Sequence, residues 1–153
     1  MLNISIIVQD ISDAVVIASY DGILVTSKHA SSHLKPLVDQ VSRIPMYEQR
    51  NWGDYRILDY KMGESPSLIK RIYMEVGKSI SYQYNTKRSE VWVIVKGKGI
   101  LTVDDVDTVV SAGSVIQVPD STKYSLLAAT QIELIEIQLG REESKEKDAM
   151  LPL

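Results

Sequence analysis

Between Tyr47 and Gly140 the chain alternates short apolar segments with turn signals at intervals of roughly ten residues, and this spacing limits its fold more than any other feature. The segments are rich in β-branched residues, which favour strands. Glycines and short Asp-Asp or Pro-Asp pairs separate them. Many short strands with regular turns are typical of a β-sandwich or a closed β-barrel. We expect strands at 54–60, 67–76, 79–84, 91–96, 99–103, 106–110, 114–118, 123–128 and 131–138.

The residues on either side of this region follow other patterns. Strands are expected at 3–8, 14–18 and 23–26, where β-branched residues precede turn signals. Apolar residues at helical spacing then predict an amphipathic helix over 28–43, although Pro36 inside it removes one hydrogen bond. The sequence therefore predicts three parts, which are an N-terminal strand and helix extension over 1–45, a barrel over 46–140, and a charged tail over 141–153 that we expect to be disordered.

Composition excludes several classes of function. The 153 residues include no cysteine, which excludes disulfides and thiolate metal sites. With 20 acidic and 17 basic residues the net charge is −3, so the chain lacks the basic field that binds nucleic acid. No apolar stretch approaches the roughly 20 residues of a membrane span, and the N-terminal residues do not resemble a signal peptide. We therefore expect a soluble, cytoplasmic protein with no nucleic-acid or membrane partner.

Two sets of residues in the barrel region match the spacing of the two motifs that describe cupins. The first motif, G-x5-H-x-H-x4-E-x6-G, has its intervals in Gly77, Gln83, Asn85, Glu90 and Gly97. The second, G-x5-P-x-G-x2-H-x3-N, has its intervals in Gly113, Pro119, Ser121, Tyr124 and Ala128. This resemblance implies a mainly β protein with the cupin double-stranded β-helix, a jelly-roll barrel. The period of two along a strand places Gln83 and Asn85 on one face, and we expect Glu90 and Tyr124 to meet them inside the barrel.

The residue types at these positions argue against a metal site. Cupin sites combine neutral imidazoles with one carboxylate, a set that suits divalent transition metals. Here the same positions hold glutamine, asparagine, glutamate and tyrosine, whose amides and phenol are weak ligands at neutral pH. We expect no tightly bound metal or other cofactor, with weak binding of a divalent cation as the alternative. His29 and His33, the two histidines of the chain, are spaced i, i+4 on the expected helix, where we expect a solvated face.

Residues 47–140 resemble more closely one family, the C-terminal module of bifunctional mannose-1-phosphate guanylyltransferase/mannose-6-phosphate isomerases. The matching segments, in order, are RNWGDY at 50–55, IKRIYMEVG at 69–77, ISYQYNTKRSEVWVIVKG at 80–97 and LIEIQLG at 134–140. Residues 3–43 are similar to the end of the nucleotidyltransferase part that precedes this module. The nucleotide-binding body with its glycine-rich loop is absent, so guanylyltransferase activity is not implied.

This resemblance implies the interconversion of mannose 6-phosphate and fructose 6-phosphate. Aldose–ketose isomerisation needs a base near neutrality and a cation beside the developing oxyanion. In the family a metal has the second role; here Glu90 is the candidate base, and Lys87 or Arg88 the candidate cation. The candidate substrate-binding residues are Gln83, Asn85, Tyr124, Lys70 and Arg71, the last two as contacts to the phosphate.

The missing histidines favour a competing interpretation, in which the barrel persists without the chemistry. Catalytic sets tend to fail as a unit. The chain would then be a non-catalytic cupin that binds a sugar phosphate or nucleotide sugar, or a regulatory or dimerisation subunit. Arg88 and Glu90 would form an ordinary ion pair at the barrel mouth, and Lys70 and Arg71 would be solvated strand residues that face opposite ways. Whether the chain is an enzyme stays open; we expect a homodimer in either case.

Overall fold

The computed structural model describes residues 5–29, 34–36, 44–84 and 88–140 and divides the chain into two compact units, Met1–Glu48 and Gln49–Leu153. In the first unit, β1 (Ala14–Ala18) pairs antiparallel with β2 (Ile23–Ser27), which confirms the two strands expected there. The strand expected over 3–8 is wrong for its described part, because residues 5–8 pair with no strand. Of the expected helix, residues 34–36 are helical, while 30–33 and 37–43 lie outside the described residues, as does the tail over 141–153.

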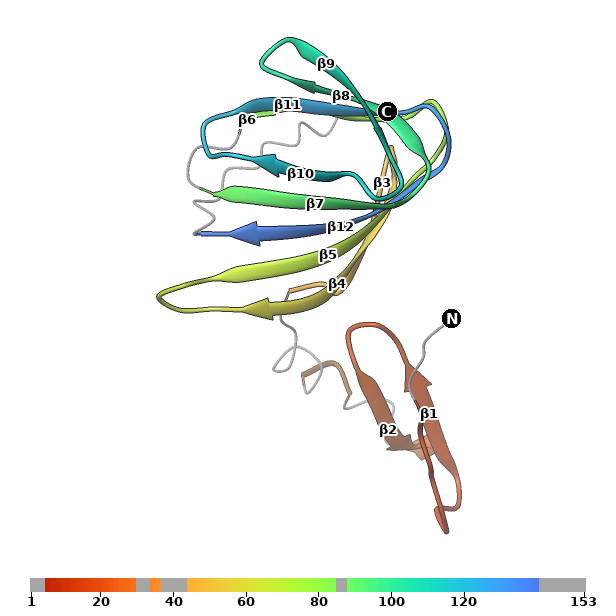
Figure 1. The fold of residues 1–153 in the computed structure, drawn as a ribbon. Coiled ribbons are helices and arrows are strands. Elements are labelled where there is room, and N and C mark those ends of the chain that lie inside the picture. The colour runs from red at the N-terminus through yellow and green to blue at the C-terminus, as the bar shows by residue number, and fades with distance from the viewer. Residues whose placement is uncertain (1–4, 30–33, 37–43, 85–87, 141–153) are drawn as a thin grey trace. The chain divides into compact units, whose positions relative to one another are not determined.

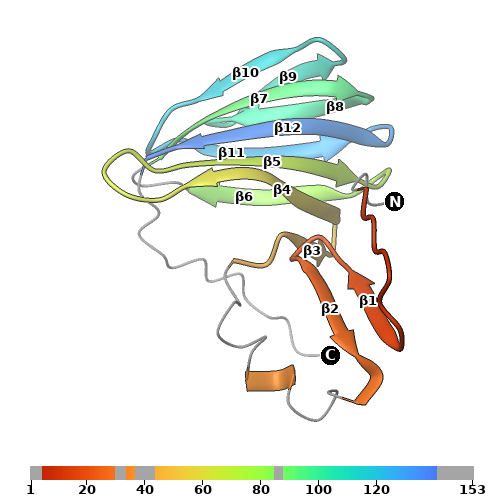
Figure 2. The same ribbon diagram turned by 90° about the horizontal axis from the view of Figure 1, so that it is seen from below.

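The second unit consists of two sheets that face each other (Figures 1 and 2). One has the strand order β10-β7-β12-β5-β4-β3 and the other the order β6-β11-β8-β9. Non-consecutive neighbours in both sheets are typical of a jelly roll. The strands are β3 (Tyr47–Arg50), β4 (Gly53–Lys61), β5 (Ser67–Met74), β6 (Ser79–Tyr84), β7 (Ser89–Lys96), β8 (Lys98–Val103), β9 (Val106–Ser111), β10 (Val115–Val118), β11 (Lys123–Ala128) and β12 (Ile132–Leu139).

All nine strands expected between residues 54 and 138 are present, with their ends shifted by two residues at most. Strand β3 was not expected, because its sequence, YEQR, contains no β-branched residue and no alternation of apolar and polar side chains. The jelly-roll fold is therefore confirmed.

Alternation along the strands fills the space between the sheets with apolar side chains. Met74, Ile94, Leu126, Ile132 and Leu134 are each at most 1% exposed. Glycine is required where strands approach closely. At Gly97, whose φ is +95°, a Cβ atom would collide with the carbonyl group of Gln131.

The inner face changes from apolar to polar along the barrel. On β12 the inward residues are Ile132 and Leu134, followed by Glu136 and Gln138. Antiparallel pairing places Glu136 opposite both Lys70 on β5 and Trp92 on β7. The polar inward residues of neighbouring strands therefore gather at one end, where β7 and β11 begin and β12 ends. We call it the polar end. No helix in the described part of the chain has the length and apolar character needed to cross a lipid bilayer.

Candidate functional site

The carboxylate of Glu90 is the centre of a buried hydrogen-bonded cluster at the polar end. The residue is 1% exposed. Arg88 Nε donates to Glu90 Oε1 at 2.9 Å, and Trp92 Nε1 and Tyr124 Oη donate to Oε2 at 3.1 and 3.0 Å. Alternation along β7 places Glu90 and Trp92 on the same face, Arg88 directly precedes this strand, and Tyr124 reaches them from β11 in the facing sheet. The Tyr124 ring meets the Trp92 ring edge-on, with centroids 5.1 Å apart.

The electrostatics of this cluster favour a fixed protonation pattern. A buried carboxylate is costly unless it is paired and hydrogen-bonded, and here one donor is a cation. Burial, together with the negative charges of Glu90 and Glu136, raises the pKa of Tyr124 far above its ordinary value of 10.0. Burial disfavours the charge of Arg88, but the nearby Glu90 and Glu136 outweigh it and raise the pKa of its guanidinium. Both groups therefore stay donors at neutral pH.

A second carboxyl group, Glu136, lies beside the first cluster. It is 5% exposed. Gln138 Nε2 donates to its Oε2 at 3.0 Å, and Lys70 Nζ is 3.6 Å from the same oxygen. Burial raises the pKa of Glu136 to about 7, a rise that the neighbouring Glu90 carboxylate reinforces and that Lys70 and Arg88 oppose. Near neutral pH, this carboxyl group is therefore divided between its charged and neutral forms.

Aromatic rings and cations form one wall of the same region. Trp52 stacks on Tyr55, with ring centroids 6.5 Å apart and an interplanar angle of 24°. Lys70 Nζ lies 4.8 Å from the centroid of the Tyr55 ring, and Arg50 Cζ lies 5.9 Å from it, both within cation–π distance. A cavity of about 40 Å³ lies among these groups. Its lining consists of Arg50, Trp52, Tyr55, Lys70, Ile72, Ile80, Arg88, Trp92, Tyr124, Glu136 and Gln138.

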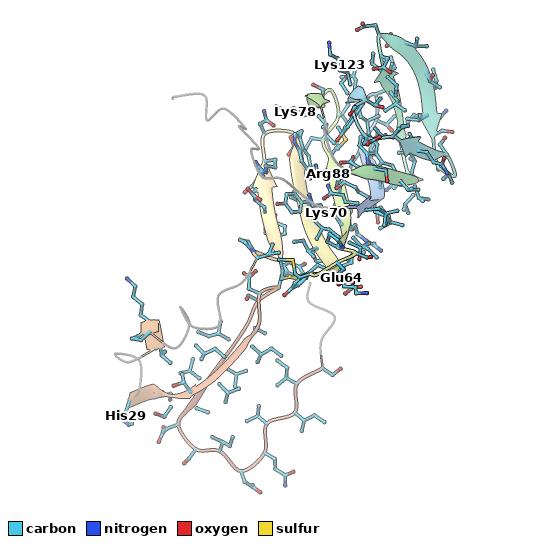
Figure 3. The ribbon with its side chains drawn as sticks, turned by 90° about the vertical axis from the view of Figure 1, so that its left-hand side faces the viewer. His29, Glu64, Lys70, Lys78, Arg88 and Lys123 are labelled. Carbon is cyan, nitrogen blue, oxygen red and sulfur yellow. The ribbon has the colours of Figure 1, made fainter. Side chains whose placement is uncertain are left out.

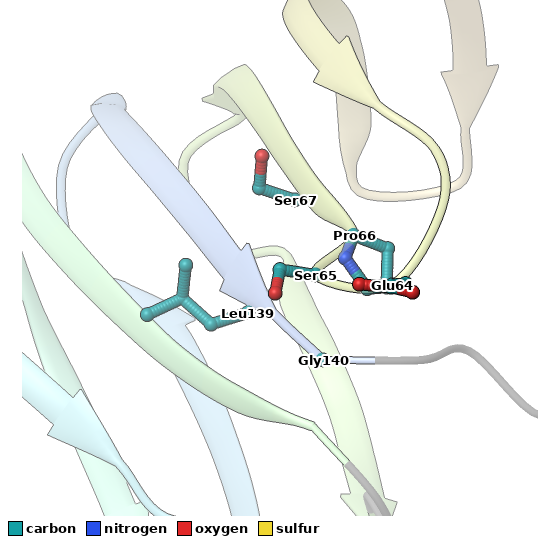
Figure 4. A pocket seen from close by; sticks show the side chains of 6 residues that line it. All are labelled: Glu64, Ser65, Pro66, Ser67, Leu139 and Gly140. Carbon is teal, nitrogen blue, oxygen red and sulfur yellow. The ribbon is translucent and has the colours of Figure 1, made fainter.

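A larger depression of about 470 Å³ shares no lining residue with this cavity (Figure 4). It lies between the β4–β5 turn and the end of β12, and Glu64, Ser65, Pro66, Ser67, Leu139 and Gly140 line it. This lining contains one titratable residue, Glu64, and that residue is exposed. The smaller cavity is therefore the better candidate for a functional site, because charged groups converge there with little access to water.

The structure brings together only some of the residues that the sequence singled out. Arg88, Glu90 and Tyr124 meet in the first cluster, and Lys70 lies in the second. Figure 3 labels Arg88 and Lys70. Arg71 lies on the opposite face of β5, where its Nη1 is 2.8 Å from Glu133 Oε1. The expected phosphate contacts Lys70 and Arg71 therefore do not share a site. Backbone pairing places Gln83 opposite Tyr124, and Asn85 and Lys87 lie outside the described residues.

Several residues of the cavity were not predicted from the sequence. Glu136 and Gln138 alternate along β12 in step with the buried Ile132 and Leu134, so all four face inward. A polar residue at an inward position of a strand is the sequence feature that could have identified them. This feature was obscured because the outward residues of β12 include isoleucines as well. Arg50, Trp52 and Tyr55 belong to the segment RNWGDY, which the family resemblance marked without assigning it a role.

The donor set of the cavity does not fit a transition metal. Glu90, at the position of the cupin carboxylate ligand, already receives three hydrogen bonds, one of them from a cation. Tyr124, at the position of the second-motif histidine, is a phenol whose raised pKa keeps it protonated. No group of three or more His, Cys, Asp or Glu side chains in the described ranges is arranged to hold a metal ion. His29 is exposed in the first unit, and His33 lies outside the described residues.

Comparisons with known proteins identify the family to which the chain belongs. A family model described as "Mannose-6-phosphate isomerase C-terminal" matches residues 40–150. Over 139 residues the chain is 27% identical to a mannose-1-phosphate guanylyltransferase of Salmonella montevideo and 30% identical to a putative mannose-1-phosphate guanylyltransferase of Vibrio cholerae serotype O1. Each alignment covers 85% of this chain and 29% of the relative, so the chain spans less than a third of the length of these curated relatives.

Solved structures agree on the fold. An RmlC-like cupin from Shewanella frigidimarina matches with a TM-score of 0.55 at 21% identity, over 67% of this chain and 91% of that one. KdgF from a Halomonas species matches with a TM-score of 0.51 at 10% identity, over 67% and 86% of the two chains. Both likenesses concern the barrel fold alone.

The raised pKa of Glu136 predicts that the protein loses stability as the pH rises from about 4.5 to about 7. Over this range the unfolded chain releases the proton of Glu136 while the folded protein keeps it, so the free energy of unfolding falls. Urea unfolding at pH 5 and pH 7.5 would measure the fall. We expect it to be smaller in Glu136→Gln by roughly 1–3 kcal/mol, because the amide does not titrate. Equal pH dependence in the two proteins would contradict the assignment.

Proposed function

Because the chain belongs to the mannose-6-phosphate isomerase C-terminal family, we propose that it binds a sugar phosphate at the polar end of its barrel without catalysing isomerisation. The observation that carries the proposal is the position of Lys70, whose side chain is 13% exposed and which lines the cavity together with Arg50 and Arg88. Lysine side chains are mostly exposed, so a lysine with this little exposure is uncommon, and three cations around one cavity suit an anionic ligand.

The charges around the cavity favour an anionic ligand. Three cations line it or its rim, against the carboxylates of Glu90 and Glu136. Glu136 is only partly ionised at neutral pH because burial raises its pKa to about 7. A phosphate monoester carries a charge of about −1.5 to −2 at pH 7 and forms short, charge-assisted hydrogen bonds to lysine and arginine.

The size of the cavity limits how a ligand would bind. At about 40 Å³ it has room for little more than a water molecule, which occupies roughly 30 Å³ in the liquid. We propose that a polar group of the ligand enters the cavity while the sugar ring stays at the rim, against the stacked rings of Trp52 and Tyr55. Aromatic faces of this kind offer apolar contact to the C–H groups of a sugar and keep their polar edges in water.

The surroundings of Glu90 support a binding role over catalysis. A general base must have a lone pair within reach of the proton that it removes. The Glu90 carboxylate is 1% exposed and is held by Arg88, Trp92 and Tyr124, so we propose that it orders the site instead of accepting a substrate proton. The positions of Gln83, Asn85 and Lys87 relative to a ligand stay predictions, as do the homodimer and a nucleotide-sugar ligand.

One observation favours an isomerase as the second candidate function. Glu136 has a pKa of about 7, which suits a general base, and Lys70 lies 3.6 Å from it. In such a reaction Glu136 would take the proton from C2 of the open-chain aldose and return it to C1. Lys70 would stabilise the negative charge that develops on the enediolate oxygen. This role for Glu136 differs from the one that the sequence assigned to Glu90.

The binding proposal predicts opposite outcomes for two neighbouring residues of β5. Lys70→Met removes the inward charge and keeps most of the side-chain volume, so we expect the affinity for mannose 6-phosphate to fall roughly tenfold. Arg71→Met removes a charge from the outward face and should leave the affinity nearly unchanged. Isothermal titration calorimetry at constant ionic strength measures both. An equal loss in the two variants, or no binding to the unaltered protein, would count against the proposed function.

The second candidate predicts turnover. A coupled assay for conversion of mannose 6-phosphate to fructose 6-phosphate, run with and without added divalent cations, should detect none if the protein only binds. If it detects turnover, the isomerase hypothesis expects Glu136→Gln to lower kcat by about a hundredfold or more while KM changes little. Turnover that survives in Glu136→Gln and disappears in Glu90→Gln would instead favour Glu90 as the base.

A further inference from the structure

We propose that Glu136 is an internal competitor for the anion site, because its carboxylate holds Lys70 in the ligand-free protein and an anionic group of the ligand replaces it there. This inference rests on the proposed function and adds to it a mechanism of ligand selection. Its basis is the arrangement of Lys70, Glu136 and Tyr55 around the cavity.

The contact between Lys70 and Glu136 is long enough to be exchanged. Lys70 Nζ is 3.6 Å from Glu136 Oε2, which exceeds the usual distance of a direct charge-assisted hydrogen bond, about 2.7–2.9 Å. The same oxygen accepts a hydrogen bond from Gln138 Nε2 at 3.0 Å. Glu136 would therefore keep a hydrogen-bond donor if Lys70 turned to another anion.

Lys70 also has a second partner, the ring of Tyr55. Its ammonium group lies 4.8 Å from the centroid of the Tyr55 ring, and Arg50 approaches that ring to 5.9 Å. Tyr55 is thus a positioning residue, whose ring attracts both Lys70 and Arg50. Both cations line the cavity, so an anion bound there would meet the charges of Lys70 and Arg50, whereas Glu136 is paired with Lys70.

This arrangement selects for the charge of the ligand. A neutral sugar is a poor substitute for a carboxylate as the partner of the little-exposed Lys70 ammonium group, since the loss of a charge partner is costly inside a protein. A phosphate monoester carries more charge than Glu136 and has three acceptor oxygens, so it can contact lysine and arginine at once. The chemical class is therefore a phosphate group, free or esterified, in preference to a neutral hexose.

The test uses substitutions whose effects on binding have opposite signs. The probes are inorganic phosphate and mannose 6-phosphate, and calorimetry gives the affinities. We expect Glu136→Gln to bind inorganic phosphate about fivefold tighter, because its amide leaves the charge of Lys70 to the ligand. We expect Lys70→Met to bind it about tenfold more weakly, and the double variant to match Lys70→Met. Lys78→Met, which removes an exposed lysine from the β5–β6 turn (Figure 3), is the charge-matched control and should bind like the unaltered protein.

The outcomes separate this inference from the proposed function. Weaker or unchanged phosphate binding by Glu136→Gln, or a gain that persists in the double variant, overturns the inference. If mannose 6-phosphate still binds in that case, the proposed function stands. If phosphate follows the expected pattern but mannose 6-phosphate does not bind, the inference stands and the sugar-phosphate function fails. No binding of either probe contradicts both. Should Glu136→Gln fail to fold, Glu136→Asp withdraws the carboxylate by one methylene and must give a gain of the same sign.

Discussion

A buried negative charge, the carboxylate of Glu90, is the constraint on which the organisation of the polar end depends. Left unpaired inside the barrel it would cost several kcal/mol. Arg88 supplies a compensating charge, and Trp92 and Tyr124 complete the hydrogen bonding. These donors also fix their own side chains, so one carboxylate orients an arginine, an indole and a phenol that come from both sheets of the barrel. Because the oxygens of Glu90 already accept these hydrogen bonds, they have little capacity left to bind a metal ion.

Antiparallel pairing extends this cluster into a site. Lys70, Glu136 and Trp92 lie in one row across β5, β12 and β7, so their side chains share the inner face. The row couples the two carboxyl groups, because the charge of Glu90 adds to burial in raising the pKa of Glu136 to about 7. The polar end therefore contains one carboxylate with a fixed hydrogen-bond network and a second carboxyl group whose charge depends on its surroundings. We attribute structural support to the first and ligand-responsive behaviour to the second.

The sequence was sufficient to predict the barrel and part of its site. Regular turns gave the nine strands, and the spacing from Gly77 to Gly97 identified Glu90 as an inward residue. Glu136 could not be found in the same way. Strand β12 has isoleucines on both faces, so its phase is ambiguous until its neighbours are known. Lys70 and Arg71 were both expected at the phosphate, although consecutive residues of a strand face opposite ways whatever its phase. Only the alternative interpretation, with the two side chains on opposite faces, respects this rule.

A spectroscopic measurement tests directly whether Trp92 donates its indole N–H to a Glu90 carboxylate that is closed to solvent and to metals. The chain has two tryptophans, so a ¹⁵N-labelled sample gives two indole signals, which Trp52→Phe assigns. We predict that the Trp92 indole proton exchanges with D2O far more slowly than that of Trp52, and that equimolar Zn²⁺ leaves its signal in place. Rapid exchange of the Trp92 proton, or a shift of its signal on addition of equimolar Zn²⁺, would contradict the account.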